Sequence, residues 1–317
     1  MIKAKSPDIE LIKRMIKSPV FFIERIWGLV PQPLVCQDIL HSHTKKCYGD
    51  FIKGKNITWQ QYHILLAVER AIRGEAPKRI SVASGHGIGK SALVSWIIHW
   101  FLFTRENAQI GCTAPTSNQI FDVLWKEIAI WHQRLPVGIK EKFEWSTTRY
   151  AIVESPKTWF ARAHTARKEA PEAFAGLHGD HVALIADESS GVPDEIYSVG
   201  EGSLTNKDTL VVLISNPRRL DGFFYNTHHS DKANWQTLVF DSEESPIVDK
   251  EFVERQRALH GEDSDEWRYM VKGLFPKEGG VLEGGWMPLI SREEIKYTDD
   301  VGRLLNPRRH NSSRIQI

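Results

Sequence analysis

The sequence has little cysteine, no excess of either charge and no long apolar run. Its 317 residues include three cysteines, Cys36, Cys47 and Cys112, which are too few and too far apart for a disulfide framework or a zinc site. This usage is typical of a reducing compartment, so we expect a cytoplasmic protein. The 41 lysines and arginines nearly balance the 40 aspartates and glutamates, so contact with nucleic acid requires a local basic patch.

The most apolar run, residues 93–103, is interrupted by Ser95 and His99. A membrane-spanning helix needs roughly 20 apolar residues, so this run predicts a buried helix instead. The first residues, MIKAKSPDIELIKRMIK, are charged and lack the apolar centre of a signal peptide. The whole chain has 41% hydrophobic and 26% charged residues, which is typical of a globular protein. Its length is enough for one large domain or two smaller ones.

Short apolar runs alternate with amphipathic patterns through the middle of the chain. Four runs predict buried strands, at residues 79–83, 108–113, 182–186 and 209–215. Four longer stretches predict helices, at residues 59–73, 90–103, 116–131 and 249–267. Strands that are apolar on both sides and alternate with helices predict an α/β fold, in which helices cover both faces of a mostly parallel central sheet.

Other stretches give weaker predictions. Residues 8–28 predict an amphipathic helix followed by an aromatic turn, FFIERIW, and residues 143–165 alternate as a hairpin would. We expect a helical N-terminal segment over residues 1–57, a core over 58–245, a C-terminal lid or linker subdomain over 246–280 and an unstructured tail over 281–317.

The stretch SGHGIGKSA lies between a predicted strand and a predicted helix, where a phosphate-binding loop belongs. Backbone N–H groups of such a loop surround phosphate oxygens at a helix N-terminus. Ser84 stands where the pattern G-x-x-x-x-G-K-[ST] has its first glycine, but serine is small enough for the end of a strand. We expect nucleotide binding by Ser84, Gly85, His86, Gly87, Ile88, Gly89, Lys90, Ser91 and Ala92.

Two side chains of this loop have distinct expected roles. Lys90 supplies a charge to the β- and γ-phosphates, and Ser91 supplies a hydroxyl to Mg²⁺. We expect His86 to serve as a spacer within the loop and to take no part in the chemistry. The alternative, a glycine-rich turn with a chance GKS, suits the flanking strand and helix less well.

Asp187 and Glu188 follow the buried run VALIA. An aspartate at this position binds Mg²⁺ beside the Ser91 hydroxyl, and a glutamate directly after it orients and deprotonates the attacking water. The alternative is a helix start capped by Asp187 or Ser189. The distance of about 97 residues from the loop favours catalysis, and the adjacent Asp-Glu favours hydrolysis over transfer to a second substrate.

Ser215 and Asn216 end the next buried run and are expected to sense the γ-phosphate and couple hydrolysis to the following segment. An ordinary Asn-Pro turn is an equal alternative. Gln60 and Gln61 precede the loop, and an amide there can recognise the adenine edge. The sequence does not choose between these glutamines, nor exclude a simple helix start.

The loop contains no arginine that could stabilise the negative charge that develops on the departing phosphate. Arg162 and Arg167 are the candidates for this role, acting on the same subunit or on a neighbour. The alternative for each is a solvated surface arginine, which is the commoner case.

With these residues in view, the chain resembles the ATPase half of the large terminase subunit of tailed bacteriophages. The resemblance extends over residues 58–276 and rests on TWQQ, ASGHGIGKS, IGCTAPTSNQIFDVLWKEI, AFAGLHGDHVALIADE, VVLISNPRRLDGFFYN and WRYMVKGLFP. It implies a P-loop NTPase of the additional-strand, catalytic-glutamate type, with small helical subdomains at both ends. That family tolerates a small residue at the position of Ser84.

The resemblance also implies roles for the site residues and an activity for the protein. Gln60 or Gln61 would read adenine, Lys90 and Ser91 would bind phosphate and Mg²⁺, Asp187 and Glu188 would be the metal and water carboxylates, Ser215 and Asn216 would couple, and Arg162 would be a loose match to a trans-acting arginine. The activity would be ATP-driven translocation of double-stranded DNA into a procapsid, by a homo-oligomeric ring with portal protein and small terminase subunit as partners.

Complete members of that family continue into a nuclease domain, and no matching acidic triad follows residue 276. We therefore expect no DNA cleavage by this chain, which would be truncated or prophage-derived. The alternatives are another DNA-dependent ATPase of the helicase-like kind, or a remnant that binds ATP and drives nothing.

Overall fold

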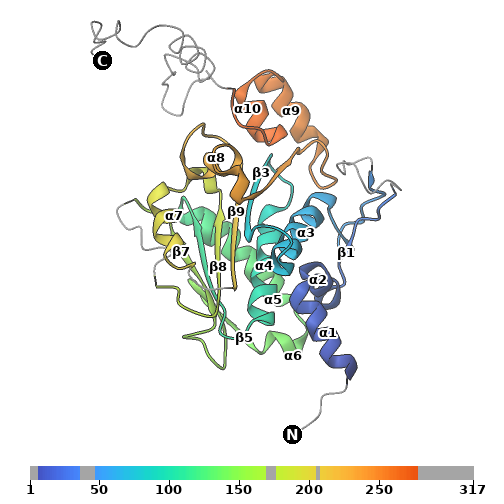
Figure 1. Cartoon of the computed structure of the whole chain (residues 1–317). Coiled ribbons are helices and arrows are strands. Elements are labelled where there is room, and N and C mark those ends of the chain that lie inside the picture. Colours follow the sequence, from blue (N-terminus) through green and yellow to red (C-terminus); the bar gives the residue numbers. More distant parts are fainter. Residues whose placement is uncertain (1–5, 36–46, 169–175, 205–207, 278–317) are drawn as a thin grey trace, which may run out of the picture.

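The computed structural model describes residues 6–35, 47–168, 176–204 and 208–277. An eight-stranded sheet runs through them in the order β10-β3-β9-β8-β4-β7-β6-β5 (Figure 1). The strands are β3 (Arg79–Ser84), β4 (Gln109–Ala114), β5 (Phe143–Trp145), β6 (Arg149–Ile152), β7 (Phe160–Thr165), β8 (His181–Asp187), β9 (Asp208–Ser215) and β10 (Gln236–Phe240). The six neighbouring strands from β10 to β7 are parallel to one another. Strand β6 runs antiparallel to both of its neighbours, β7 and β5. The predicted α/β class is confirmed.

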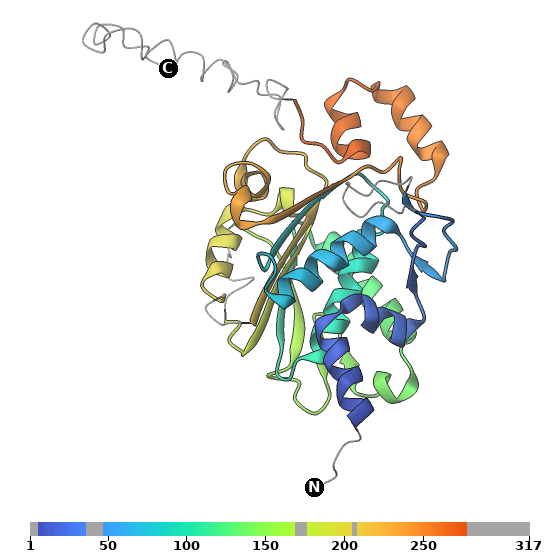
Figure 2. The same cartoon turned by 45° about the vertical axis from the view of Figure 1, so that its right-hand side comes forward.

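Helices cover both faces of this sheet (Figures 1 and 2). On one side lie α1 (Ser6–Lys17), α2 (Pro19–Trp27), α3 (Trp59–Arg73), α4 (Lys90–Thr104), the wide turn η2 (Asn118–Trp125), α5 (Lys126–Gln133) and α6 (Val137–Lys140). On the other side lie η4 (Ser189–Gly191), α7 (Asp194–Glu201), α8 (Gly222–His228) and η5 (Lys232–Asn234). Alternate residues of β8 enter the two apolar layers: Ala183 and Ile185 one, Val182 and Leu184 the other. A strand buried on both faces has this continuous apolar sequence.

Two smaller parts flank the sheet. The short parallel pair β1 (Val30–Pro31) and β2 (Asn56–Ile57) joins the N-terminal helices to α3. The C-terminal helices α9 (Lys250–His260), α10 (Asp265–Trp267) and η6 (Arg268–Lys272) lie beyond the carboxyl ends of β3 and β9, and Figure 1 shows them at the top of the molecule. We call these three helices the lid. None of the helices in the described ranges is long and apolar enough to cross a membrane.

Helix α3 shows how local chemistry sets its ends. Thr58 and Gln61 form a reciprocal capping box, in which each side chain accepts from the other residue's backbone N–H. Gly74 ends the helix with φ 75°, a left-handed conformation that glycine adopts without strain. The predicted and observed bounds of this helix agree.

Several predicted elements differ from the structure. The expected aromatic turn FFIERIW is wrong: it belongs to helix α2, because Ser18 caps its N-terminus and Pro19 occupies the first turn. The single helix expected over 249–267 is also wrong, because it breaks at Gly261 and restarts after the Ser264 cap. The expected hairpin continues into β7, which pairs with β4.

The sequence analysis missed β10, which adds to β3 at the edge of the sheet. Only its last residue, Phe240, is buried, so no continuous apolar run marks it. The tail predicted for residues 281–317 lies outside the described residues.

Candidate active site

The phosphate loop, the acidic pair and the Ser-Asn pair meet at one edge of the sheet. Strands β3, β9 and β8 are neighbours in that order and parallel, so their carboxyl ends lie side by side. The loop follows β3, Ser215 ends β9, and Asp187 ends β8. In open α/β sheets this edge is where ligands bind. The structure therefore brings together three motifs that are far apart in the sequence.

The loop needs its glycines for two reasons. Gly87 and Gly89 have φ of 82° and 83°, which side chains rarely adopt. Gly85 has ordinary backbone angles, but a Cβ there would overlap the Val271 carbonyl of the lid. Ser84 is fully buried at the end of β3, where its hydroxyl donates to the Gly85 carbonyl. Serine is thus accommodated at the first position of the loop.

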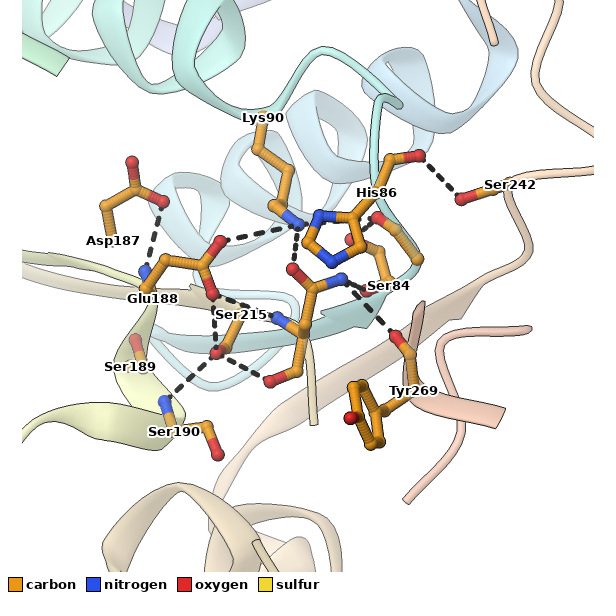
Figure 3. A network of polar contacts seen from close by, with 12 residues as sticks. Ser84, His86, Lys90, Asp187, Glu188, Ser189, Ser190, Ser215, Ser242 and Tyr269 are labelled. Atoms are coloured by element: carbon orange, nitrogen blue, oxygen red, sulfur yellow. Dashed lines mark hydrogen bonds and ion pairs between the residues drawn. The ribbon is translucent and has the colours of Figure 1, made fainter. Parts of the chain in front are cut away.

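Lys90 begins α4 and points into the site (Figure 3). Its Nζ lies 3.2 Å from Asn216 Oδ1, 3.3 Å from the Gly85 carbonyl and 3.8 Å from Glu188 Oε1. Burial lowers the pKa of Lys90, and the nearby carboxylates of Glu188 and Asp187 oppose that shift. The ammonium is therefore held where the anionic phosphates of a nucleotide would lie.

The Asp187 carboxylate is buried, with 4% of the residue exposed. Burial and the neighbouring Glu188 raise the pKa of Asp187 to about 6, against the attraction of Lys90. A buried carboxylate is stabilised by a cation, and oxygen donors are the ligands that Mg²⁺ prefers. The carboxyl chemistry of Asp187 suits such an ion, and Asp187 with the Ser91 hydroxyl stays the predicted pair of ligands. In the described part of the chain, no group of three acidic, histidine or cysteine side chains could hold a metal alone, so phosphate and water would complete its coordination.

Glu188 has a left-handed backbone, with φ 50°. Its Oε2 lies 3.3 Å from Ser215 Oγ and accepts from the Asn216 N–H at 3.4 Å. The Ser190 N–H donates to Ser215 Oγ at 3.0 Å. A non-glycine residue in this conformation is strained, and such strain is common where a side chain must be aimed. The carboxylate is held by neighbours on β9 and faces the loop.

Beyond Glu188 lies a cavity of about 310 Å³. Glu188, Ser215 and Asn216 line one part of it, and polar groups of the β4 end and of the segment after β9 line the rest, including Thr116, Gln119, Arg218 and Arg219. The cavity gives room for a water molecule against the carboxylate, which hydrolysis requires.

Asn216 connects the site to the lid. Its amide Nδ2 donates to the Ser84 carbonyl at 2.6 Å and to the Tyr269 carbonyl at 3.4 Å, while its Oδ1 accepts from Lys90. The two neighbouring carbonyls of the lid are also engaged: Met270 accepts from the His86 N–H and Val271 from the Ser242 N–H, both at 2.7 Å. Consecutive lid carbonyls therefore contact Asn216, the loop and the segment after β10.

His86 contributes its backbone to this docking, since its carbonyl also accepts from Ser242 Oγ at 2.7 Å. In Figure 3 its ring lies beside the Lys90 side chain. Burial and the positive Lys90 lower the pKa of His86 to about 4, so the ring is neutral near pH 7. The remaining loop residue, Ile88, is buried in the main core.

The two candidate glutamines differ in their surroundings. The Gln61 amide is engaged at both ends: Nε2 donates to the Gly89 carbonyl at 3.0 Å, and Oε1 accepts from the Thr58 N–H at 3.0 Å. The Gln60 Nε2 donates to the Asp241 carbonyl at 3.3 Å, and its buried Oε1 has no partner among the described residues. Gln61 thus supports the loop, and Gln60 has an unsatisfied acceptor.

Arg162 is not brought to the site within this chain. It lies in the middle of β7, two strands away from β8, and pairs in register with Gly111 and Arg149. Burial and Arg149 lower its pKa. Arg167 lies beyond β7 and is exposed. An action of either residue on a neighbouring subunit stays a prediction.

The sequence predicts neither the role of the lid carbonyls nor that of residues 241–249, which connect β10 to α9. Backbone carbonyls have no sequence signature, and DSEESPIVD matches no nucleotide-binding pattern. Only the position of WRYMVKGLFP among the quoted motifs pointed to this region.

Comparison with known proteins agrees with the geometry. No family model matches the chain. The protein named "Probable terminase, large subunit" of Enterobacteria phage P7 is 32% identical over 268 residues, which cover 80% of this chain and 53% of that protein. This chain therefore spans about half the length of that relative.

Two solved structures share the fold. The large terminase of a thermophilic bacteriophage, in complex with ADP, matches 70% of this chain and 55% of its own, with 14% identity and a TM-score of 0.57. The large terminase ATPase domain of Thermus phage P74-26 matches 72% of this chain and 94% of its own, with 18% identity and a TM-score of 0.51.

Proposed function

We propose, because the chain belongs to the large terminase family of tailed bacteriophages, that it hydrolyses ATP to move double-stranded DNA into a procapsid. The observation that carries the proposal is the meeting of Lys90, Glu188 and Asn216 at the carboxyl edge of the sheet. Such a cluster of mutually oriented groups, with a lysine whose pKa is lowered by burial, is typical of a catalytic site.

The residues divide the chemistry among them. Loop N–H groups and Lys90 bind the phosphates, and Ser91 with Asp187 would hold Mg²⁺. The ion supplies charge neutralisation when it is bound with the nucleotide. Glu188 accepts a proton from the attacking water, held in place by Ser215 Oγ and the Asn216 N–H. Glutamate at this position and the room for a water molecule in the adjacent cavity favour hydrolysis over transfer to a second substrate.

Asn216 is proposed to pass the state of the nucleotide to the lid. Its Oδ1 contacts the ammonium that would bind the γ-phosphate, and its Nδ2 contacts the Tyr269 carbonyl. A phosphate bound beside Lys90 would compete with Asn216 Oδ1 for the Lys90 ammonium. The Asn216 amide would then lose one of its hydrogen bonds. The lid would then shift through its backbone bonds to Asn216 and His86.

The proposed partners follow from family membership: DNA, a portal protein, a small terminase subunit and further copies of this chain in a ring in the host cytoplasm. A subunit in a ring can receive an arginine from its neighbour, and Arg162 is the candidate donor. The proposal is tested by steady-state ATP hydrolysis with and without linear duplex DNA, by the parent and by Lys90→Ala. Turnover that rises with DNA and disappears in the variant supports a motor; DNA-independent turnover contradicts coupling to DNA.

A further inference from the structure

The segment between β10 and α9, residues 241–249, lies against the phosphate loop; we call it the crossing segment. It is fixed to α3 at two points: Gln60 Nε2 donates to the Asp241 carbonyl at 3.3 Å, and Trp59 Nε1 donates to the Glu244 carbonyl at 3.1 Å. Its later residues are therefore placed against the loop by α3, the same helix whose Gln61 holds the Gly89 carbonyl.

Two apolar side chains of the crossing segment lie on the loop glycines. A Cβ built on Gly87 would lie 3.1 Å from Val248 Cγ2, and one built on Gly89 would lie 3.1 Å from Ile247 Cδ1. Val248 packs both against the main core and against the lid cluster of Val253, Trp267 and Val271. Val248 therefore has a structural role that explains its position.

Ile247 has no such explanation. It keeps 39% of its surface exposed and belongs to none of the apolar clusters among the described residues. Burying an exposed aliphatic side chain is favourable, and an isoleucine left open beside a glycine of the phosphate loop presents an apolar surface to a ligand.

The polarity of the site identifies which part of a nucleotide would meet this surface. Lys90, Asp187 and Glu188 gather at the inner end of the loop, where the γ-phosphate and its metal belong. Ile247 lies instead beside Gly89, the residue that precedes α4 and contacts Gln61. Gln61, one of the two glutamines expected to read the base, donates to the Gly89 carbonyl, and Ile247 Cδ1 lies against the same glycine, so Ile247 is on the side of the loop where we expect the base.

We propose that Ile247 is the apolar wall of the nucleoside subsite, packing against the sugar and base of the bound triphosphate. This inference rests on the proposed ATPase function. It makes Ile247 a specificity-determining residue, which contributes to the binding of a nucleoside triphosphate but not to the binding of the phosphate chain alone.

The test compares two probes, ATP and inorganic tripolyphosphate, each with Mg²⁺, by titration calorimetry on the full chain. In Ile247→Ala we expect the Kd for ATP to rise about five- to tenfold, from the loss of part of one aliphatic contact. The Kd for tripolyphosphate stays within about twofold, which also shows that the variant is folded. Leu259→Ala is the matched control, because Leu259 is a 67% exposed aliphatic residue on α9, and it leaves both values unchanged.

Three results would overturn the inference. An equal loss for both probes means that Ile247 supports the loop itself. No loss for either probe, or equal parent affinity for ATP and tripolyphosphate, means that no nucleoside contact exists there. A different result bears on the proposed function alone. If the parent binds tripolyphosphate and ATP but does not hydrolyse ATP, the proposed function is contradicted, and the comparison of the two probes still tests the nucleoside contact.

Discussion

Asn216 shows at the scale of single residues how one side chain can serve two parts of the molecule. Its amide is shared between the ammonium of Lys90, the carbonyl of Ser84 and the carbonyl of Tyr269, and its backbone N–H holds Glu188. An aspartate of the same shape would accept from Lys90 but could not donate to either carbonyl.

We therefore expect Asn216→Asp to keep ATP binding and lose coupling. The expected result is a kcat about tenfold or more below the parent, because buried donors to Ser84 and Tyr269 are lost and a second carboxylate faces Glu188. Hydrogen exchange at residues 268–272 should quicken. Asn234→Asp is the control, since that amide donates to Asp231 Oδ1 in an exposed turn away from the site. Unchanged turnover and exchange in Asn216→Asp would contradict the coupling role.

Gln61 carries a second prediction at the residue scale. Gln61→Ala removes the bond to the Gly89 carbonyl and half of the α3 capping box, so it should lower the free energy of unfolding by about 1 kcal/mol. It should also weaken tripolyphosphate and ATP alike, because it supports the loop. Urea unfolding and calorimetry measure both effects; a loss confined to ATP would assign Gln61 to the base instead.

At the scale of elements, the lid is joined to the loop by backbone contacts that leave no room for side chains. Gly273 has φ 65°, and a Cβ there would lie 2.7 Å from Ser84 Cα and 2.9 Å from the Gly85 nitrogen. Gly28, at the end of α2, has a similar left-handed backbone, with φ 69° and ψ 17°, but nothing lies within 4 Å of a Cβ built on it. The pair separates backbone strain from close approach.

We expect Gly273→Ala to destabilise the protein by at least about 2 kcal/mol more than Gly28→Ala. Both substitutions add left-handed strain of about 1 kcal/mol, but only the first pushes the lid away from Ser84 and Gly85. Urea unfolding measures the difference, and faster hydrogen exchange at residues 85–89 should accompany it. Equal effects of the two substitutions would show that the lid contact contributes nothing beyond strain.

The same scale explains what sequence could predict. The strand before the loop, the loop itself and the run ending at Asp187 were predictable because each depends on residues close together in the chain. Strand β10 and the contact of Ile247 with Gly89 were not, because both depend on segments that meet only after folding. The different surroundings of Gln60 and Gln61 could not be predicted either, since the two residues have the same chemistry and adjacent positions; which of them reads adenine stays a prediction.

At the scale of the whole molecule, buried neutral histidines link stability to pH. Burial lowers the pKa of His99 to about 3, and its ring packs against Trp27 and Tyr150 in the main core. The unfolded chain takes up a proton near pH 6.5, whereas the folded chain does so only near pH 3. Stability from this residue is therefore present above pH 6.5 and is lost as the pH falls from 6.5 towards 3.

We expect the free energy of unfolding of the parent to fall by up to about 1.4 kcal/mol for each pH unit between about 6 and 4 because of His99. His99→Phe keeps an aromatic ring and removes the titration, so its slope over this range should be smaller by that amount. Urea unfolding at several pH values measures both slopes. Parallel slopes would mean that His99 is not neutral in the folded protein.

The central claim is that Glu188 activates the attacking water but is not needed for nucleotide binding. The most direct measurement is single-turnover cleavage of ATP by the parent and by Glu188→Gln, with the Kd for ATP measured on both. The account predicts a similar Kd and a cleavage rate at least about 100-fold lower in Glu188→Gln, because glutamine keeps the contacts with Ser215 and Asn216 but cannot accept the proton. Cleavage at the parent rate would contradict it.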